Sequence, residues 1–156
     1  MTLAQIQDLS FMLVSNSTHP DQGSPSGAMF SWTGAATTAN TFTIRPYLFE
    51  GWTVKFCRWV CAWTPNTPGA SPAISRLVYA DDGPSNITEI ARFTHTNYMT
   101  PIDDTVDITA IIKPLWNAWR DAGVGKHIGH QTAGDGLDSP LIYQSRIELF
   151  LCPDLG

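Results

Sequence analysis

Apolar and polar positions alternate with a period of two over much of the chain, a pattern typical of half-buried β-strands. The clearest example runs from Trp52 to Trp63. One side of this strand carries Trp52, Val54, Phe56, Arg58, Val60 and Ala62, and the other carries Thr53, Lys55, Cys57, Trp59, Cys61 and Trp63. The first side is apolar apart from its arginine, and the second holds two Trp and two Cys. We therefore predict a central strand that is partly covered on both faces.

The same alternation predicts further strands, separated by segments rich in turn formers. We expect these strands at 11–14, 28–33, 41–46, 73–80, 87–96, 127–131 and 141–151. In the last strand the apolar side consists of Tyr143, Ser145, Ile147, Leu149 and Leu151. Residues 97–104 are expected to cross over from the strand at 87–96 to a helical stretch.

That helical stretch follows Asp107, where the period of two gives way to three- and four-residue spacing. The residues that recur at this spacing are Ile108, Ile111, Ile112, Leu115 and Trp119. They would share one buried face of a short helix near residues 109–122. Pro114 lacks an N–H and is tolerated only near a helix start, so we expect the helix to begin close to it. Gly123 supplies a residue for a left-handed stop.

These elements predict an all-β fold, a jelly-roll β-sandwich with one short helix near residues 109–122. A chain of 156 residues is long enough for one domain with a substantial core, and we take 1–156 as a single β-sandwich domain. The segment SNSTHPDQGSPSG, around residues 15–27, is dense in turn formers and predicts an extended N-terminal loop or arm. Such an arm is either mobile or held by a neighbouring subunit.

Composition changes this picture mainly through charge. Charged residues make up 15% of the chain, well below the usual quarter, while apolar residues at 43% are ordinary. A neutral surface suits coverage by other subunits, and it equally suits a monomer with few charges. The net charge is −5 and the nine Lys and Arg are spread singly, which argues against nucleic-acid binding. No apolar run is long enough for a membrane span and no signal peptide is recognisable, so we expect the chain to be made in a cytosol and to stay there until it is assembled.

The three cysteines are Cys57, Cys61 and Cys152. Cys57 and Cys61 share one side of the strand at 52–63 but lie roughly 13 Å apart along it. That separation is too large for a disulfide. We predict buried free thiols for all three, rather than a metal or redox site.

Candidate catalytic and metal-binding groups fail on spacing. His127 and His130 are three apart on a predicted strand and would point to opposite faces, so they would not converge on one ion. His19 and His95, the acidic pairs Asp81–Asp82 and Asp103–Asp104, and the Asp135–Asp138 cluster are explained as ordinary core or turn residues. No nucleophile elbow, P-loop or zinc-protease motif is present. We predict no catalytic residue, no metal site and no cofactor, hence no enzyme.

Six tryptophans invite a different interpretation, because aromatic faces stack on sugar rings and on partner proteins. Trp52 and Trp119 fall on predicted core faces. Trp59, Trp63 and Trp116 are the ones expected to face outward, where an intersubunit interface and a ligand platform are equally acceptable interpretations.

A resemblance is carried by the segments VDITAIIKPLWNAW, HIGHQTAGDG and PLIYQSRIELFL. They resemble the C-terminal half of carbohydrate-binding-like β-sandwich modules, in which a D-V-T … W segment precedes a strand, a loop and a final strand with S-R-E near its start. Such jelly-roll modules also serve as accessory parts of bacteriophage particles, in head decoration (cement) proteins and tail fibres.

The resemblance implies a phage virion structural protein that decorates the capsid as a cement protein and stabilises the assembled head through inter-subunit contacts. Its partners would be further copies of itself, with a trimer preferred, and the major capsid protein of the same particle. It would be made in the host cytoplasm and reside in the virion. The alternative is a carbohydrate-binding or tail-fibre receptor-binding module, with glycans as ligands and Trp59, Trp63 or Trp116 as platforms.

Overall fold

The computed structural model describes residues 11–18, 37–80, 87–133 and 140–156. Within these ranges the strands are β1 (Phe11–Thr18), β2 (Thr37–Ile44), β3 (Trp52–Thr64), β4 (Ala73–Ala80), β5 (Ile87–His95), β6 (Ile102–Asp107), β7 (Lys126–Ala133) and β8 (Leu141–Pro153). The short 3-10 helix η1 (Pro46–Leu48) follows β2, and the helix α2 (Thr109–Asp121) lies between β6 and β7.

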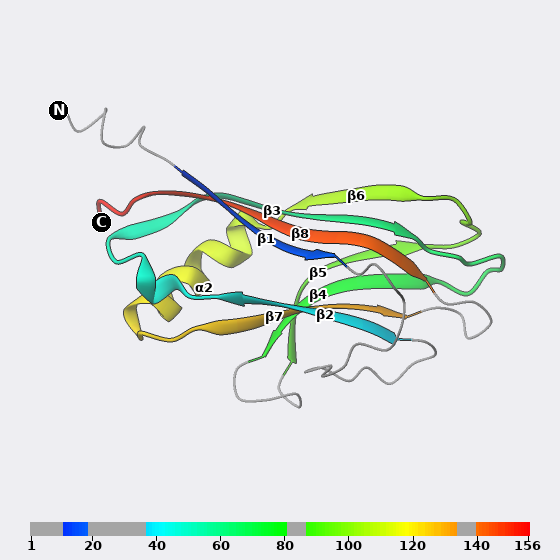
Figure 1. Cartoon of the computed structure of the whole chain (residues 1–156), viewed down its shortest axis with the longest axis horizontal. Coiled ribbons are helices and arrows are strands. Elements are labelled where there is room, and N and C mark those ends of the chain that lie inside the picture. The colour runs from blue at the N-terminus through cyan, green and yellow to red at the C-terminus, as the bar shows by residue number, and fades with distance from the viewer. Residues whose placement is uncertain (1–10, 19–36, 81–86, 134–139) are drawn as a thin grey trace.

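The strands form two four-stranded antiparallel sheets, in the orders β1-β8-β3-β6 and β2-β7-β4-β5 (Figure 1). The pairing runs from the outside of the chain inward: β1 with β8, β2 with β7, β3 with β6 and β4 with β5. When these four antiparallel strand pairs are rolled up together, β3 comes to lie beside β8 and β4 beside β7. The result is the strand order of an eight-stranded jelly roll, which confirms the predicted fold class.

One apolar cluster occupies the space between the sheets, and α2 closes it at one end (Figure 1). Its members include Val54, Cys57, Trp59, Cys61 and Trp63 from β3, Leu77 from β4, Ile128 from β7, Ile147, Leu149 and Leu151 from β8, and Ile108, Ile112 and Trp116 from the helical stretch. Removal of this apolar surface from water is the main force holding the sheets and the helix together.

The strand β3 is central, as predicted, because β8 and β6 flank it on either side. Its register against β8 shifts between Val54 and Phe56, which leaves Lys55 as an extra, exposed residue. Side chains alternate along a strand, so one inserted residue moves every following side chain to the opposite face. Val54 faces the core before the shift, and Trp59 faces it after the shift. Reading one alternation across the whole strand was therefore wrong.

The apolar side predicted for β8 is confirmed from Ser145 to Leu151. The four residues of that side in this range are all buried: Ser145, Ile147, Leu149 and Leu151. Tyr143 is the exception, since its side chain is 48% exposed. A second register shift, between Ala62 and Trp63 on the partner strand, leaves Tyr143 without a paired residue there. It thus faces solvent, and its hydroxyl lies 2.9 Å from the Oγ1 of Thr64.

The helix lies where expected, but it begins at Thr109 rather than close to Pro114. Two contacts fix the start: Asp107 accepts the N–H of Thr109, and the Thr109 hydroxyl pairs with the backbone of Cys57 on β3. Pro114 therefore lies inside the helix, where it leaves the exposed Ala110 without its usual helical donor. Gly123 has a φ of 68° and ends the helix, as predicted.

Other boundaries differ from the sequence analysis. The strand β6 at 102–107 was missed, since only Ile102 and Val106 mark its inner side among three aspartates. Residues 15–18 belong to β1, so the predicted arm does not include them, and 19–27 lie outside the described residues, as does the predicted strand at 28–33. The strand at 41–46 is longer at its start and ends at Ile44.

Candidate interaction site at the helix end

The prediction that Trp59, Trp63 and Trp116 face outward is wrong, because each is at most 1% exposed. The bulge in β3 turns Trp59 and Trp63 toward the core, and the extra helical turn before Pro114 brings Trp116 onto the buried face. Their N–H groups are satisfied within the chain: Trp59 donates to Ser145, Trp63 to Asp104 and Trp116 to the carbonyl of Trp52. Trp59 also stacks on Phe93 at 4.6 Å. These rings are packing elements and present no face to a ligand.

The acidic pair Asp103–Asp104 lies on β6 and not in a turn. Asp103 is exposed, whereas Asp104 accepts hydrogen bonds from Trp63 and His95, both at 2.8 Å. Because His95 belongs to β5, this contact ties the two sheets together along the side formed by β5 and β6. Asp104 is therefore a structural acceptor between the sheets.

Other candidates fall outside what can be described. His19, Asp81, Asp82, Asp135 and Asp138 lie outside the described residues, as does the side chain of His127. In the described part of the chain, no group of three or more His, Cys, Asp or Glu is placed to hold a metal ion. No helix in that part is long and apolar enough to cross a bilayer.

One group of potentially reactive side chains does come together, between the sheets. The Oγ of Ser75 lies 2.6 Å from Nε2 of His130, and the thiol of Cys61 lies 3.5 Å from the same hydroxyl. We call these three residues the core polar cluster. All are fully buried, and the Nδ1 of His130 has no partner. Burial lowers the pKa of His130 to about 3 and raises that of Cys61 to about 12. Both groups are thus neutral at pH 7 and out of reach of solvent.

Burial also keeps the cysteine thiols between the sheets neutral. Cys57 and Cys61 are free and buried, as predicted, and burial also raises the pKa of Cys57 to about 12. Cys152 is free but only partly buried, so the prediction of burial was incomplete for it. It lies near the end of β8, where the sheet meets the helix end of the molecule.

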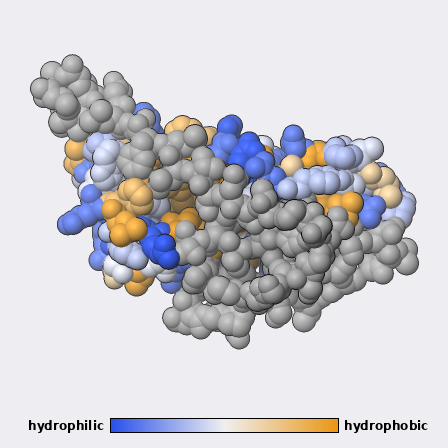
Figure 2. Space-filling model, viewed as in Figure 1, coloured by the Kyte–Doolittle hydropathy of each residue, from blue (hydrophilic) through white to orange (hydrophobic). Residues whose placement is uncertain are grey.

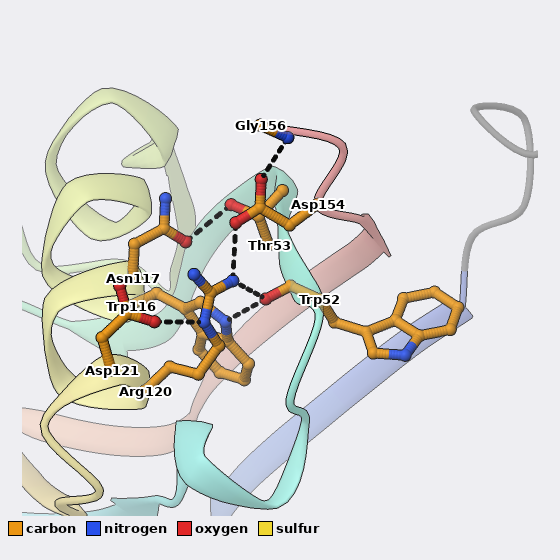
Figure 3. A network of polar contacts seen from close by, with 8 residues as sticks. All are labelled: Trp52, Thr53, Trp116, Asn117, Arg120, Asp121, Asp154 and Gly156. Atoms are coloured by element: carbon orange, nitrogen blue, oxygen red, sulfur yellow. Dashed lines mark hydrogen bonds and ion pairs between the residues drawn. The ribbon is translucent and has the colours of Figure 1, made fainter. Parts of the chain in front are cut away.

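A second polar cluster lies at the end of the molecule where α2 meets the end of β8, which we call the helix end (Figure 3). Arg120 of α2 donates to the carboxylate of Asp154 and to the carbonyl of Trp52, at 2.8 and 2.6 Å, and to Asp121 at 2.8 Å. Beside it, Thr53 donates to Asn117 at 2.7 Å. We call this set the helix-end network. It joins α2, the start of β3 and the residues that follow β8, and its hydrogen bonds from Arg120 lower the pKa of Asp154.

On one side of Asp154 the surface is hollowed into a groove of about 590 Å³, which we call the helix-end groove. It is lined by Tyr47, Glu50, Gly51, Arg120, Asp121, Ala122, Gly123 and Asp154. Tyr47 lies close to Gly125 in the turn after α2. A Cβ added to Gly125 would lie 3.7 Å from Cε1 of Tyr47 and 3.3 Å from the carbonyl oxygen of Ile44. Tyr47 is nevertheless 41% exposed and Leu48 beside it 64%. Figure 2 shows hydrophobic surface beside hydrophilic surface at this end of the molecule.

On the other side of Asp154 the lining changes from acidic to basic. A hollow of about 400 Å³ is lined in part by Lys55, Lys113, Asn117 and Leu155. It continues through Lys55 into a smaller hollow of about 290 Å³, lined by Lys55, Phe56, Arg58 and Phe150. Phe56 and Phe150 pack against each other with ring centres 5.8 Å apart. We call the four residues of the smaller hollow, together with Lys113, the basic patch.

Sequence reasoning missed this site entirely. Tyr47, Glu50 and Arg120 are scattered over about half of the chain, and only the roll of the strands brings η1, the end of α2 and the end of β8 together. The usable signal was the pair of glycines after α2 and the short PYL segment, since turns at a strand end carry exposed side chains.

No family model matches the sequence, and no curated protein matches it. Among solved structures, the chain is similar to one from Desmodium yellow mottle tymovirus, with 11% identity and a TM-score of 0.36 over 94% of this chain and 86% of that one. It is also similar to CBM35 from Cellvibrio japonicus Abf62, with 13% identity and a TM-score of 0.32 over 89% and 92%.

A third similar structure is dimeric latent PorU from Porphyromonas gingivalis, with 10% identity and a TM-score of 0.41. The match covers 94% of this chain and 13% of that chain, so the present chain spans a small fraction of PorU's length. None of the three superposes closely enough to transfer a function or a set of site residues to this chain.

Proposed function

We propose that the chain is a virion structural protein, a phage capsid decoration or cement protein that binds the assembled head and stabilises it through inter-subunit contacts. The observation that carries the proposal is the complete jelly-roll strand order, in which the reactive side chains of the core polar cluster are shut between the sheets. Eight-stranded jelly rolls are common in viral capsid proteins and in lectins, so the argument is one of fold-level analogy.

The exposed surface supports the same proposal. Large apolar side chains are exposed at the helix end, where Leu48, Tyr47 and Val124 lie close to charged grooves. Apolar side chains within a polar rim are the usual makeup of a protein–protein interface. A protein of this kind acts by mass action: because it binds the assembled shell and not free subunits, it stabilises the shell by the free energy of that contact. Its partners would be the major capsid protein and further copies of itself, with a trimer as the expected state.

The alternative, a carbohydrate-binding or tail-fibre receptor-binding module, required exposed tryptophans as stacking platforms. Trp59, Trp63 and Trp116 are buried, so the module loses the residues on which it rested. Tyr47 is an exposed aromatic residue beside a groove, and it gives the alternative its own test. A saturable glycan-array signal that Tyr47→Ala abolishes would favour the receptor module over the cement protein.

The proposal is tested by sedimentation with phage heads. Heads stripped of the chain, or assembled without it, are mixed with increasing amounts of purified chain and pelleted through a cushion. We expect binding that saturates at a fixed number of copies per head, and no binding to unassembled major capsid protein. Absence of the chain from mature particles by mass spectrometry, together with no saturable binding to heads, would contradict the proposal.

A further inference from the structure

We propose that the helix-end groove of one copy receives the basic patch of a second copy, so that neighbouring chains associate head to tail. The inference rests on the proposed function for its use, since a head-to-tail contact repeated around an axis gives the closed ring that a decoration protein would present to a capsid. The contact itself is inferred from the opposite charges of the groove and the patch and from the apolar side chains that both carry.

The groove carries an excess of negative charge. Three of its lining residues are acidic, Glu50, Asp121 and Asp154, and Arg120 is its one basic lining residue. Arg120 is already engaged by Asp154 and by Asp121. Asp121 is 68% exposed and binds Arg120 through Oδ1, and Glu50 makes no hydrogen bond or ion pair within the described part of the chain. Both carboxylates therefore have oxygens that can accept from a partner.

The groove also offers apolar contact. The ring of Tyr47 borders it, and Leu48 and Val124 are exposed on the same turns. A tyrosine that lines a groove favours a partner that combines a cation with an apolar or aromatic surface, because the ring face attracts cations and the ring body excludes water.

The basic patch has the opposite charge and the same kind of apolar component. Lys55 is the extra residue of the β3 bulge and projects into solvent, as does Lys113 on α2. Arg58 and Arg146 share the single carboxylate of Glu148, which leaves positive charge in excess on this face. The half-buried rings of Phe56 and Phe150 form the floor between them.

The two surfaces lie on either side of Asp154, which lines both the groove and the hollow leading to the patch. A rigid chain cannot bring its own patch into its own groove, because the folded residues around Asp154 stand between them. A second copy can. Each chain then uses both surfaces, one toward each neighbour, and the contact is heterologous. Charges of opposite sign on the two sides speed the encounter, fix its direction and disfavour like against like.

The test uses two variants that reverse the charge of exposed side chains and leave the bonds from Arg120 to Asp154 and to the carbonyl of Trp52 in place. Glu50→Lys/Asp121→Lys makes both surfaces basic, and Lys55→Glu/Lys113→Glu makes both acidic. Light scattering after size exclusion should show the native chain as an oligomer that dissociates at high salt. Each variant alone should associate about a hundredfold more weakly, and an equimolar mixture of the two should recover association between one copy of each variant, because the groove of one then meets a patch of opposite sign on the other.

A matched control tests whether the change in net charge alone weakens the association. Thr88→Lys/Thr94→Lys/Asp103→Lys changes exposed residues on β5 and β6 and adds as much positive charge as the Glu50/Asp121 variant. It should associate like the native chain. Circular dichroism melts of all variants establish that they are folded, which is expected because every substituted side chain is exposed.

Three results would overturn the inference: a native chain that is monomeric at the highest concentration, variants that associate as well as the native chain, or a mixture that fails to recover. In the first case the groove is left for a different partner, such as the capsid surface. These outcomes are distinct from failure of the proposed function, because a monomer that saturates phage heads is still a decoration protein.

Discussion

The two polar clusters of this molecule have similar ingredients and opposite surroundings. The core polar cluster joins Cys61, Ser75 and His130 between the sheets, and the helix-end network joins Arg120 and Asp154 where α2 meets the end of β8. Both draw on residues far apart in the chain. The first is completely buried and neutral, whereas the second is charged and partly exposed.

The difference shows that burial, more than residue type, decides what a polar cluster can do. A histidine, a serine and a cysteine within hydrogen-bond distance are familiar catalytic types, yet their buried location removes the charge that nucleophilic chemistry needs. At the helix end, charged groups border two open hollows and keep carboxylates and ammonium groups in water. This is the surface that we propose for contact with another protein.

The largest expected effect comes from breaking the packing around the core polar cluster. Trp59 stacks on Phe93 and meets the ring of His130 edge-on, so Trp59→Ala should lower the free energy of unfolding by about 3–5 kcal/mol. Urea unfolding followed by circular dichroism measures the change. Ile111→Ala, which removes an exposed apolar side chain from α2, serves as the control and should cost well under 1 kcal/mol. Equal losses in the two variants would mean that Trp59 is not a core residue.

An intermediate effect is expected from pH. The pKa of His130 is lowered from its ordinary 6.5 to about 3 because the folded chain buries the ring. The unfolded chain therefore binds a proton that the folded chain does not bind. The free energy of unfolding should fall as the pH drops from about 6.5 toward 3. Between pH 7 and pH 5 the loss should be roughly 2 kcal/mol, at 1.36 kcal/mol per pKa unit.

The variants for this experiment separate the histidine from its neighbours. His130→Gln should flatten the pH dependence of the free energy of unfolding between pH 7 and 5. Ser75→Ala should destabilise the protein at every pH and keep the native slope, since His130 stays buried. A native slope in His130→Gln would show that another group is responsible.

The smallest effect is expected at the helix-end network. Asp154→Asn removes the charged acceptor of Arg120 and should cost about 1 kcal/mol at pH 7, because both side chains are partly in water. The pKa of Asp154 is lowered by Arg120, so this contribution is present above the ordinary carboxyl pKa and is lost as the pH falls below it.

Hydrogen exchange gives the local readout for this substitution. The N–H of Asp154 donates to the carbonyl of Gly51 at 2.7 Å, and it should exchange faster in Asp154→Asn while β3 remains protected. Asp103→Asn, on the exposed side of β6, is the control and should change neither quantity. Unchanged exchange in Asp154→Asn would mean that the network does not order the residues after β8.

Much of the fold could be predicted from periodicity, because buried residues recur every two positions along a strand and every three or four along a helix. The strand at Ala73–Ala80 and the helix near 109–122 were predicted correctly for this reason. The bulge at Lys55 was not, since one extra residue in a strand leaves no mark in composition yet reverses every side chain beyond it. That single residue accounts for the misplacement of Trp59 and Trp63.

The helix-end groove and the basic patch could not be predicted, because they depend on which strand ends the roll brings together. Glu50 and Asp121 look like ordinary turn and helix-end acids in the sequence. The start of α2 was misjudged for a related reason. Tertiary bonds from Thr109 to β3 hold a helical turn that the presence of Pro114 argues against.

The most direct test of the central claim, that this protein works by adding contact area to an assembled shell, is the temperature at which phage heads release their genome. Heads lacking the chain are heated with a DNA-binding dye, with and without saturating purified chain. The account predicts that release shifts upward by several degrees and that the shift levels off when binding saturates. Heads that bind the chain to saturation and release DNA at an unchanged temperature would contradict it.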